Sequence, residues 1–266
     1  MIGTVLRLEL RRSRSLTIWL ALTAFLYSAV IAGFYPVLVE SMSFVEDFLK
    51  TFPEGLLAGF GVDASFSDPG VYYTSNVGIA LWPIVAAIAA VAIGTRVAAD
   101  TERGWIELPL AGRLPRTAYL GAAIAVEMIV LAVLAAATVA GVIVGGELVG
   151  AGFDASRFAL AGVAAWIWAL PIAAIATLLA VCTLSRSRTA GVVAGILVLM
   201  YLLRLVAQIE PSLGWLGSLS AFDYLYPTPI IDDGVFRPGD LLILGGVTVA
   251  SWGGSLWAFR RRDLVA

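Results

Sequence analysis

Histidine is absent from the 266-residue sequence, and cysteine and lysine occur once each, as Cys182 and Lys50. The missing histidine excludes His-based acid–base catalysis and the usual His-containing metal sites. A single cysteine excludes a disulfide framework. Lys50 does not lie in a GxxxxGK[ST] sequence, so the chain has no P-loop for hydrolysing ATP. We therefore expect no catalytic residue, no metal site and no cofactor bound by this chain.

Charged residues are also scarce, at 14% of the chain, whereas hydrophobic residues make up 60%. Soluble domains have about 25% charged residues. A helix that spans a bilayer needs roughly 20 apolar residues, and backbone groups in lipid must be paired within the helix. Six runs meet that length: 16–39, 77–97, 119–144, 158–184, 190–209 and 241–259. The sequence predicts an all-α integral membrane protein with six transmembrane helices in a single domain, residues 1–266.

The charges between these runs are distributed unequally. If alternate loops lie on the same side, one side holds 13 of the 17 basic residues. The other side holds only Lys50, Arg157 and Arg237. Because basic residues near span ends favour the cytoplasm, we expect both termini and the loop at 98–117 to be cytoplasmic. That result requires an even number of spans, which six satisfies.

The first fifteen residues, MIGTVLRLELRRSRS, predict an amphipathic helix. Val5 and Leu6 follow Ile2 at helical spacing, while Arg7 and Arg11 line another face. Such a helix lies at the cytoplasmic membrane interface. A frayed basic tail that only fixes orientation remains the alternative. The apolar run that follows is too long for the core of a cleaved signal peptide, so we expect a retained anchor.

The two longest loops on the opposite side, 40–75 and 210–240, carry amphipathic and aromatic residues. We expect short interfacial helices in the first and aromatic anchors such as Trp215 and Tyr224 in the second. Whether these loops gate an exit or only anchor the protein remains open. Within the spans, Gly141-xxx-Gly145 and Gly191-xxx-Gly195 permit close helix approach. Packing inside the bundle is the first interpretation of both, and a homodimer contact is the second.

Two charged residues, Glu127 and Arg204, fall within predicted spans. An ionised side chain at the bilayer centre costs roughly 2.5–3.5 kcal/mol on insertion scales, so such residues face protein or water. We therefore consider both residues candidates for an intramembrane polar site. For Arg204 the simpler interpretation is a long side chain that extends towards the membrane surface.

The stretch ERGWIELPLA at 102–111, followed by Arg116, resembles the E-x-G-T-L-E-L-L-L-A … R segment of ABC-2-type transporter permeases. That segment lies between the second and third spans of the family, as it does here. FPEGLLAGFG in the first outer loop, SAFDYLYPTP before the last span and the terminal FRRRDL agree with the family. Trp105, Pro109, Arg113 and Pro115 depart from its pattern.

The resemblance implies the permease subunit of an ATP-binding-cassette (ABC) exporter in a prokaryotic cell membrane. Such a subunit pairs with a second copy or with another permease, and it contacts two copies of an ABC ATPase that bind ATP and Mg. The segment after the second span would form a coupling helix in a groove of the ATPase. By analogy, the contact residues are Glu102, Gly104, Ile106, Glu107, Leu110 and Arg116.

Other functions are compatible with the same residues. The loop at 98–117 could be an ordinary solvated loop, or could tether a soluble partner to a non-transporting anchor or sensor. An intramembrane enzyme acting on lipid would need polar residues at one depth, and the spans offer only Glu127 and Arg204. No nucleic-acid-binding surface is indicated. The sequence does not identify a transported substrate.

Overall fold

A computed structural model describes residues 2–41, 68–105, 115–225 and 227–261. Six helical segments in these residues are long and apolar enough to cross a membrane, and no strand occurs among them. The first is α1 (Ile2–Glu40), and the second combines α4 (Pro69–Tyr73), η1 (Thr74–Leu81), α5 (Trp82–Gly94) and α6 (Arg96–Glu102). The others are α8 (Arg116–Leu148), α9 (Ala155–Thr183), α10 (Arg186–Ile209) and α12 (Pro238–Arg261). The predicted all-α fold with six spanning helices is confirmed.

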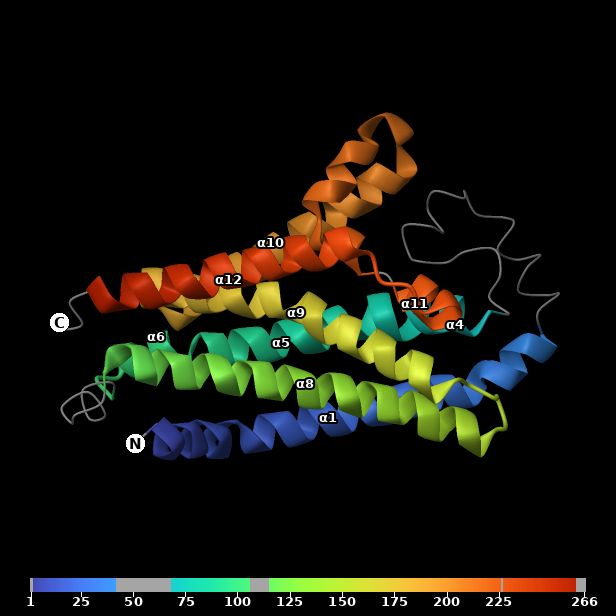
Figure 1. The fold of residues 1–266 in the computed structure, drawn as a ribbon, viewed down its shortest axis with the longest axis horizontal. Coiled ribbons are helices and arrows are strands. Elements are labelled where there is room, and N and C mark those ends of the chain that lie inside the picture. The colour runs from blue at the N-terminus through green and yellow to red at the C-terminus, as the bar shows by residue number, and fades with distance from the viewer. Residues whose placement is uncertain (1, 42–67, 106–114, 226, 262–266) are drawn as a thin grey trace.

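The start of α1 and the end of α12 lie at the same end of the bundle, beside α6 (Figure 1). An even number of long antiparallel segments produces this arrangement. It agrees with the prediction that the two ends of the chain share a side. The side of the membrane on which they lie stays a prediction from loop charge.

The second spanning segment begins earlier than expected, at Pro69 rather than near residue 77. Asp68 caps α4, because its Oδ1 accepts hydrogen bonds from the backbone N–H groups of Gly70 and Val71 at 2.7 and 3.2 Å. After α4 the chain widens into the π-helix η1 and then enters α5. Pro83, in the first turn of α5, has no N–H to donate, which removes one α-helical bond at this junction.

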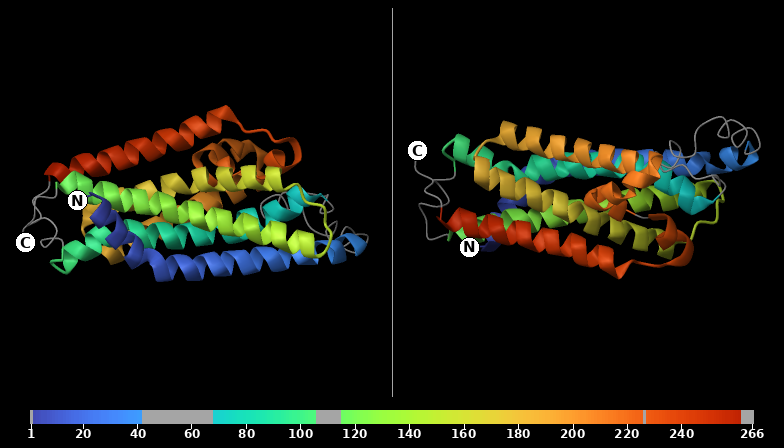
Figure 2. Two further views of the ribbon diagram at one scale, coloured as in Figure 1. Left: turned by 60° about the horizontal axis from the view of Figure 1, so that its bottom comes forward. Right: turned by 90° about the horizontal axis from the view of Figure 1, so that it is seen from above.

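The predicted amphipathic segment at the N-terminus is helical and continuous with the first span in α1. Its first turns lie at an angle to the rest of the helix (Figure 2). Near the bend, the hydroxyl of Ser13 donates to the carbonyl of Glu9, and Thr17 donates to that of Ser13. Hydroxyl bonds of this kind bend helices. The segment is therefore an angled extension of α1 and not a separate helix.

Helices α1, α5, α8 and α9 pack closely around an apolar core. Gly141 and Gly145 of α8 lie directly against the backbone of α1, at Phe25 and Ala29, where a Cβ atom has no room. This first small-residue motif packs inside the bundle, as predicted. On the opposite side of the core, the indole of Trp82 donates to the carbonyl of Ala165 at 2.9 Å. Small residues and buried hydrogen bonds such as this one hold these helices together.

Helix α10 is much less enclosed than α5, α8 and α9. Only 11% of its most apolar window is buried in the chain, against 50% for α8. Gly191 and Gly195 have nothing within 4 Å of an added Cβ, so the second motif does not pack inside the bundle. The end of α10 and the following 3₁₀-helix η2 (Pro211–Leu219) project from the other helices (Figure 1). Helix α10 thus keeps an open apolar face.

The loop after α10 folds into short helices, η2, η3 (Ala221–Tyr224) and α11 (Pro227–Asp233). Trp215 is 63% exposed, as expected of an aromatic anchor. Tyr224 donates its hydroxyl to the carbonyl of Ser218 at 2.7 Å, which closes the turn between η2 and η3. The predicted interfacial helices at residues 42–67 lie outside the described residues.

Candidate coupling site at one end of the bundle

The described part of the predicted coupling segment, residues 98–117, begins within α6 and resumes at the start of α8. Helix α6 ends at Glu102, and Gly104 follows with a φ of 69°. Glycine adopts this left-handed conformation without steric cost and commonly ends helices. The expectation that Gly104 lets the chain turn is thus consistent with the backbone geometry.

Glu102 connects α6 to α10. Its Oε1 accepts a hydrogen bond of 3.2 Å from the backbone N–H of Arg186, the first residue of α10. A carboxylate at a helix N-terminus pairs a free N–H group and interacts favourably with the helix dipole. The first residue of the predicted site therefore contacts the least enclosed helix of the bundle.

The remaining predicted residues of this site divide into two groups. Arg116 is the first residue of α8, and Pro115 precedes it as the cap. Ile106, Glu107 and Leu110 lie outside the described residues. The structure places Glu102, Gly104 and Arg116 at the same end of the bundle, but it does not test their contact with a partner.

A charge cluster that the sequence analysis did not identify lies beside this segment. Arg12 of α1 donates to both carboxylate oxygens of Asp100 in α6, at 2.7 and 2.8 Å, and to Glu9 at 2.8 Å. Both acids are nearly inaccessible, with 2% exposure for Glu9 and 3% for Asp100. Two parallel N–H···O bonds between guanidinium and carboxylate are strong and fix the relative orientation of the groups.

Two further residues complete the cluster. Arg96 donates to the hydroxyl oxygen of Ser13 at 2.7 Å and to Glu9 at 3.3 Å. From α8, Tyr119 donates its hydroxyl to Asp100 at 2.7 Å. The cluster thus joins three helices. Two features of the sequence could have indicated the cluster. Glu9 is an acidic residue in a basic segment, and Arg96 and Asp100 are opposite charges one helical turn apart at the end of a predicted span.

Glu127 lies inside the bundle, with 1% of its surface exposed. Thr177 of α9 donates to its Oε2 at 2.8 Å, while Oε1 has no hydrogen-bond partner among the described residues. A Cβ atom on Gly94 of α5 would lie 2.8 Å from that oxygen, so glycine leaves the space that the carboxylate occupies. Glu127 therefore occupies a polar position enclosed by neighbouring helices.

Arg204 is on α10 and is 7% exposed. The chain itself encloses most of the residue, and the extension of its side chain towards the membrane surface stays a prediction. Glu127 and Arg204 lie on different helices, α8 and α10, and their role in an intramembrane polar site stays a prediction.

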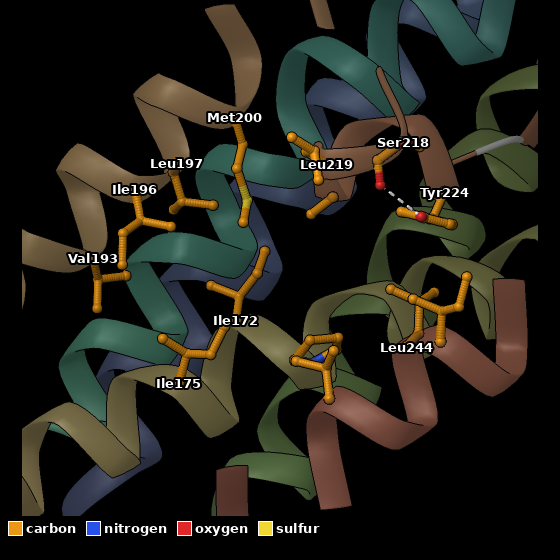
Figure 3. Close-up of a pocket in the computed structure, with 14 residues that line it drawn as sticks. Ile172, Ile175, Val193, Ile196, Leu197, Met200, Ser218, Leu219, Tyr224 and Leu244 are labelled. Atoms are coloured by element: carbon orange, nitrogen blue, oxygen red, sulfur yellow. Dashed lines mark hydrogen bonds between the residues drawn. The ribbon is translucent and has the colours of Figure 1, made fainter. Parts of the chain in front are cut away.

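Two apolar hollows flank α10. A cavity of about 270 Å³ lies between α9, α10, α12 and the short helices that follow α10, and Ile172, Leu197, Met200 and Leu244 line it (Figure 3). A groove of about 670 Å³ lies between α5 and α10, with Ile84, Leu197 and Val198 on its walls. Among the described residues, none that lines either hollow is charged. Such surroundings suit apolar ligands and provide no group for acid–base chemistry.

The described residues include no group of three or more Cys, Asp and Glu side chains that could hold a metal ion. The fold and its candidate site define a polytopic α-helical membrane protein with a polar segment at one end. Over residues 2–260 the sequence matches the family described as "Multidrug efflux system permease Rv1217c, C-terminal domain". The chain belongs to this permease family and is a transport subunit rather than an enzyme. No curated protein sequence matches the chain.

Proposed function

We propose that this chain is the membrane subunit of an ATP-driven exporter in a prokaryotic cell membrane, energised by two copies of a separate ABC ATPase. The observation that carries the proposal is the position of the 98–117 segment. Its described flanks lie at the end of the bundle shared by both ends of the chain, and Glu102 contacts the first residue of α10. A soluble protein bound there has direct access to a helix with open space on both sides.

ATP and Mg would bind to the partner, since this chain has no P-loop lysine. Closure of the two ATPases would move the coupling segments and rock the spanning helices as rigid bodies. In this mechanism Glu102, Gly104, Ile106, Glu107, Leu110 and Arg116 form the contact. The apolar residues would seat the segment, and Glu107 would accept a charge-assisted bond from a basic residue of the ATPase.

Two copies of the chain, or this chain and a related permease, would form the export path. The open face of α10 with Gly191 and Gly195 supports this part of the proposal, because small residues allow two helix backbones to approach closely. The apolar hollows beside α10 suit uncharged or amphipathic compounds. That chemistry agrees with the multidrug efflux named in the description of the family.

The substitution Glu107→Arg tests the proposal. It would place a positive charge against the basic partner residue, so ATP hydrolysis in the reconstituted complex should continue while export falls by about tenfold, a typical coupling between sites. Glu147→Arg makes the same charge change at an exposed position at the far end of α8 and should have no such effect. Hydrolysis and efflux are measured side by side in proteoliposomes.

Two outcomes would contradict parts of this scheme. If the purified chain bound no ATPase encoded beside it, the assignment as an ABC subunit would be wrong. If Glu107→Arg exported normally at normal expression, Glu107 would not belong to the contact. If the complex with the ATPase forms, a screen for compounds that stimulate ATP hydrolysis identifies the class of substrate.

A further inference from the structure

The charge cluster around Asp100 lies between the proposed coupling segment and α1. We propose that the Arg12–Asp100 ion pair is the link through which movement of the coupling segment reaches α1. This inference rests on the proposed function, since it assigns a path to the movement that the ATPase produces. Arg12 and Asp100 act as positioning residues and need not contact the substrate.

Helix α6 has the contacts that such a link requires. It has only seven residues, and a turn at Thr95 separates it from α5. Asp100 joins it to α1 through Arg12 and to α8 through Tyr119. Two residues later, Glu102 joins it to α10. A displacement of α6 is therefore passed on by paired charges on one side and by a helix-capping bond on the other.

The burial of the acids makes the ion pair more than a surface contact. Exposed ion pairs contribute little, but a buried charge that loses its partner is strongly destabilised. Asp100 and Glu9 are nearly inaccessible, and the Arg12 side chain is 31% exposed. The pair therefore stays closed as α6 moves, and the start of α1 moves with it. Arg96, bonded to Glu9 and Ser13, supports the same contact.

The bend in α1 allows the start of this helix to move separately from its long part. The first turns of α1 lie at an angle to the remainder of the helix (Figure 2). In the N-terminal part of α1, the Ser13 hydroxyl donates to the carbonyl of Glu9. Beyond the bend, α1 packs along α8 through Gly141 and Gly145. The start of α1 can thus follow α6 while the long part of α1 stays fixed against the core.

The test compares Arg12→Asp, Asp100→Arg and the double charge exchange in the full permease–ATPase complex. Each single variant should bind the ATPase and hydrolyse ATP, while the number of molecules exported per ATP falls by about tenfold. The double exchange should restore at least half of that ratio, because it re-forms the pair with reversed polarity. Arg11→Asp is the matched control, since Arg11 is exposed and lies one residue away.

Two further measurements guard against variants that merely fold poorly. Tyr119→Phe keeps every charge and removes one hydrogen bond to Asp100, so it should lower the export ratio less but in the same direction. Hydrogen exchange of residues 96–102 needs no ATPase. It should accelerate in Arg12→Asp, remain unchanged in Arg11→Asp and slow again in the double exchange.

The outcomes separate the two proposals. A wild-type chain that binds no ATPase would overturn the proposed function and, with it, the transmission of movement. Intact ATPase binding with an unchanged export ratio in Arg12→Asp would overturn only the inference, as would a double exchange that fails to restore the ratio. A static brace would lower stability in the single variants without changing export per ATP.

Discussion

Helices α8 and α10 each carry a Gly-xxx-Gly motif, but the two motifs have different surroundings. In α8, Gly141 and Gly145 press against the backbone of α1, whereas Gly191 and Gly195 of α10 face open space. A cavity lies on one side of α10 and a groove on the other. Close packing resists small displacements, while a helix beside hollows can shift with few lost contacts. The comparison indicates a fixed frame of α1, α5, α8 and α9 and a more adaptable helix, α10.

The largest expected effect comes from overfilling the frame. Gly145→Leu places its side chain into the backbone carbonyl of Ala29, which has no room to yield. We expect a loss of about 3 kcal/mol in the free energy of unfolding, at the upper end of the usual cost of overpacking. Thermal unfolding in detergent measures it.

The matched control is Gly195→Leu on α10, where an added Cβ meets nothing within 4 Å. This variant should unfold at the wild-type temperature and should instead reduce the cross-linked dimer fraction, because the open face is the proposed contact between copies. Equal destabilisation of both variants would remove the distinction between α8 and α10.

An intermediate effect is expected from filling the cavity beside α10. Met200→Trp adds volume to the cavity of about 270 Å³ and should change stability by less than about 1.5 kcal/mol. Export should fall several-fold, because α10 can then no longer approach α9 and α12. Val249→Trp is the control, since Val249 is 73% exposed on α12 and does not line the cavity. Normal export by Met200→Trp would show that the cavity does not need to close.

The smallest effect concerns the end of the bundle opposite the proposed coupling segment. Burial and the nearby carboxylate of Asp68 raise the pKa of Asp232 in α11 from 3.8 to about 6. Asp233 adds to this effect, and Arg157 opposes it. Because the pKa is raised in the folded state, the stabilisation by protonated Asp232 is complete below 3.8 and is lost as the pH rises through about 6.

Asp232→Asn should therefore flatten the dependence of stability on pH in that range. The measurement is hydrogen exchange of α11 at pH values on both sides of 6, compared with Asp233→Asn, whose side chain is exposed. An unchanged pH dependence in Asp232→Asn would show that another group titrates there.

Much of the fold could be predicted because hydrophobic length is a strong signal. Each of the six predicted runs falls almost entirely within a helix of the structure, since a bilayer requires about 20 apolar residues in each. The early start at Pro69 and the π-helix at Thr74–Leu81 were missed. Both features depend on the Asp68 cap and on Pro83. A hydropathy pattern contains no information on helix caps or on the missing N–H group of proline.

The candidate site was predicted less completely. The resemblance identified Glu102 and Gly104, and the structure adds the hydrogen bond from Arg186 to Glu102 and the turn at Gly104. The cluster of Glu9, Arg12 and Asp100 was missed, because loop charge treats arginines as orientation signals and does not tell which of them pairs with a distant acid. Arg12 and Asp100 are 88 positions apart in the sequence, and only folding brings them together.

By itself, the sequence determined the class of this protein: its six apolar runs predict six membrane-spanning helices, and the absence of histidine excludes His-based acid–base catalysis. The tertiary structure decided which of two similar glycine motifs is filled, where the charges pair and which helix keeps open space. The physical reason is that hydropathy and length act along one helix, whereas close packing and ion pairing depend on which helices meet.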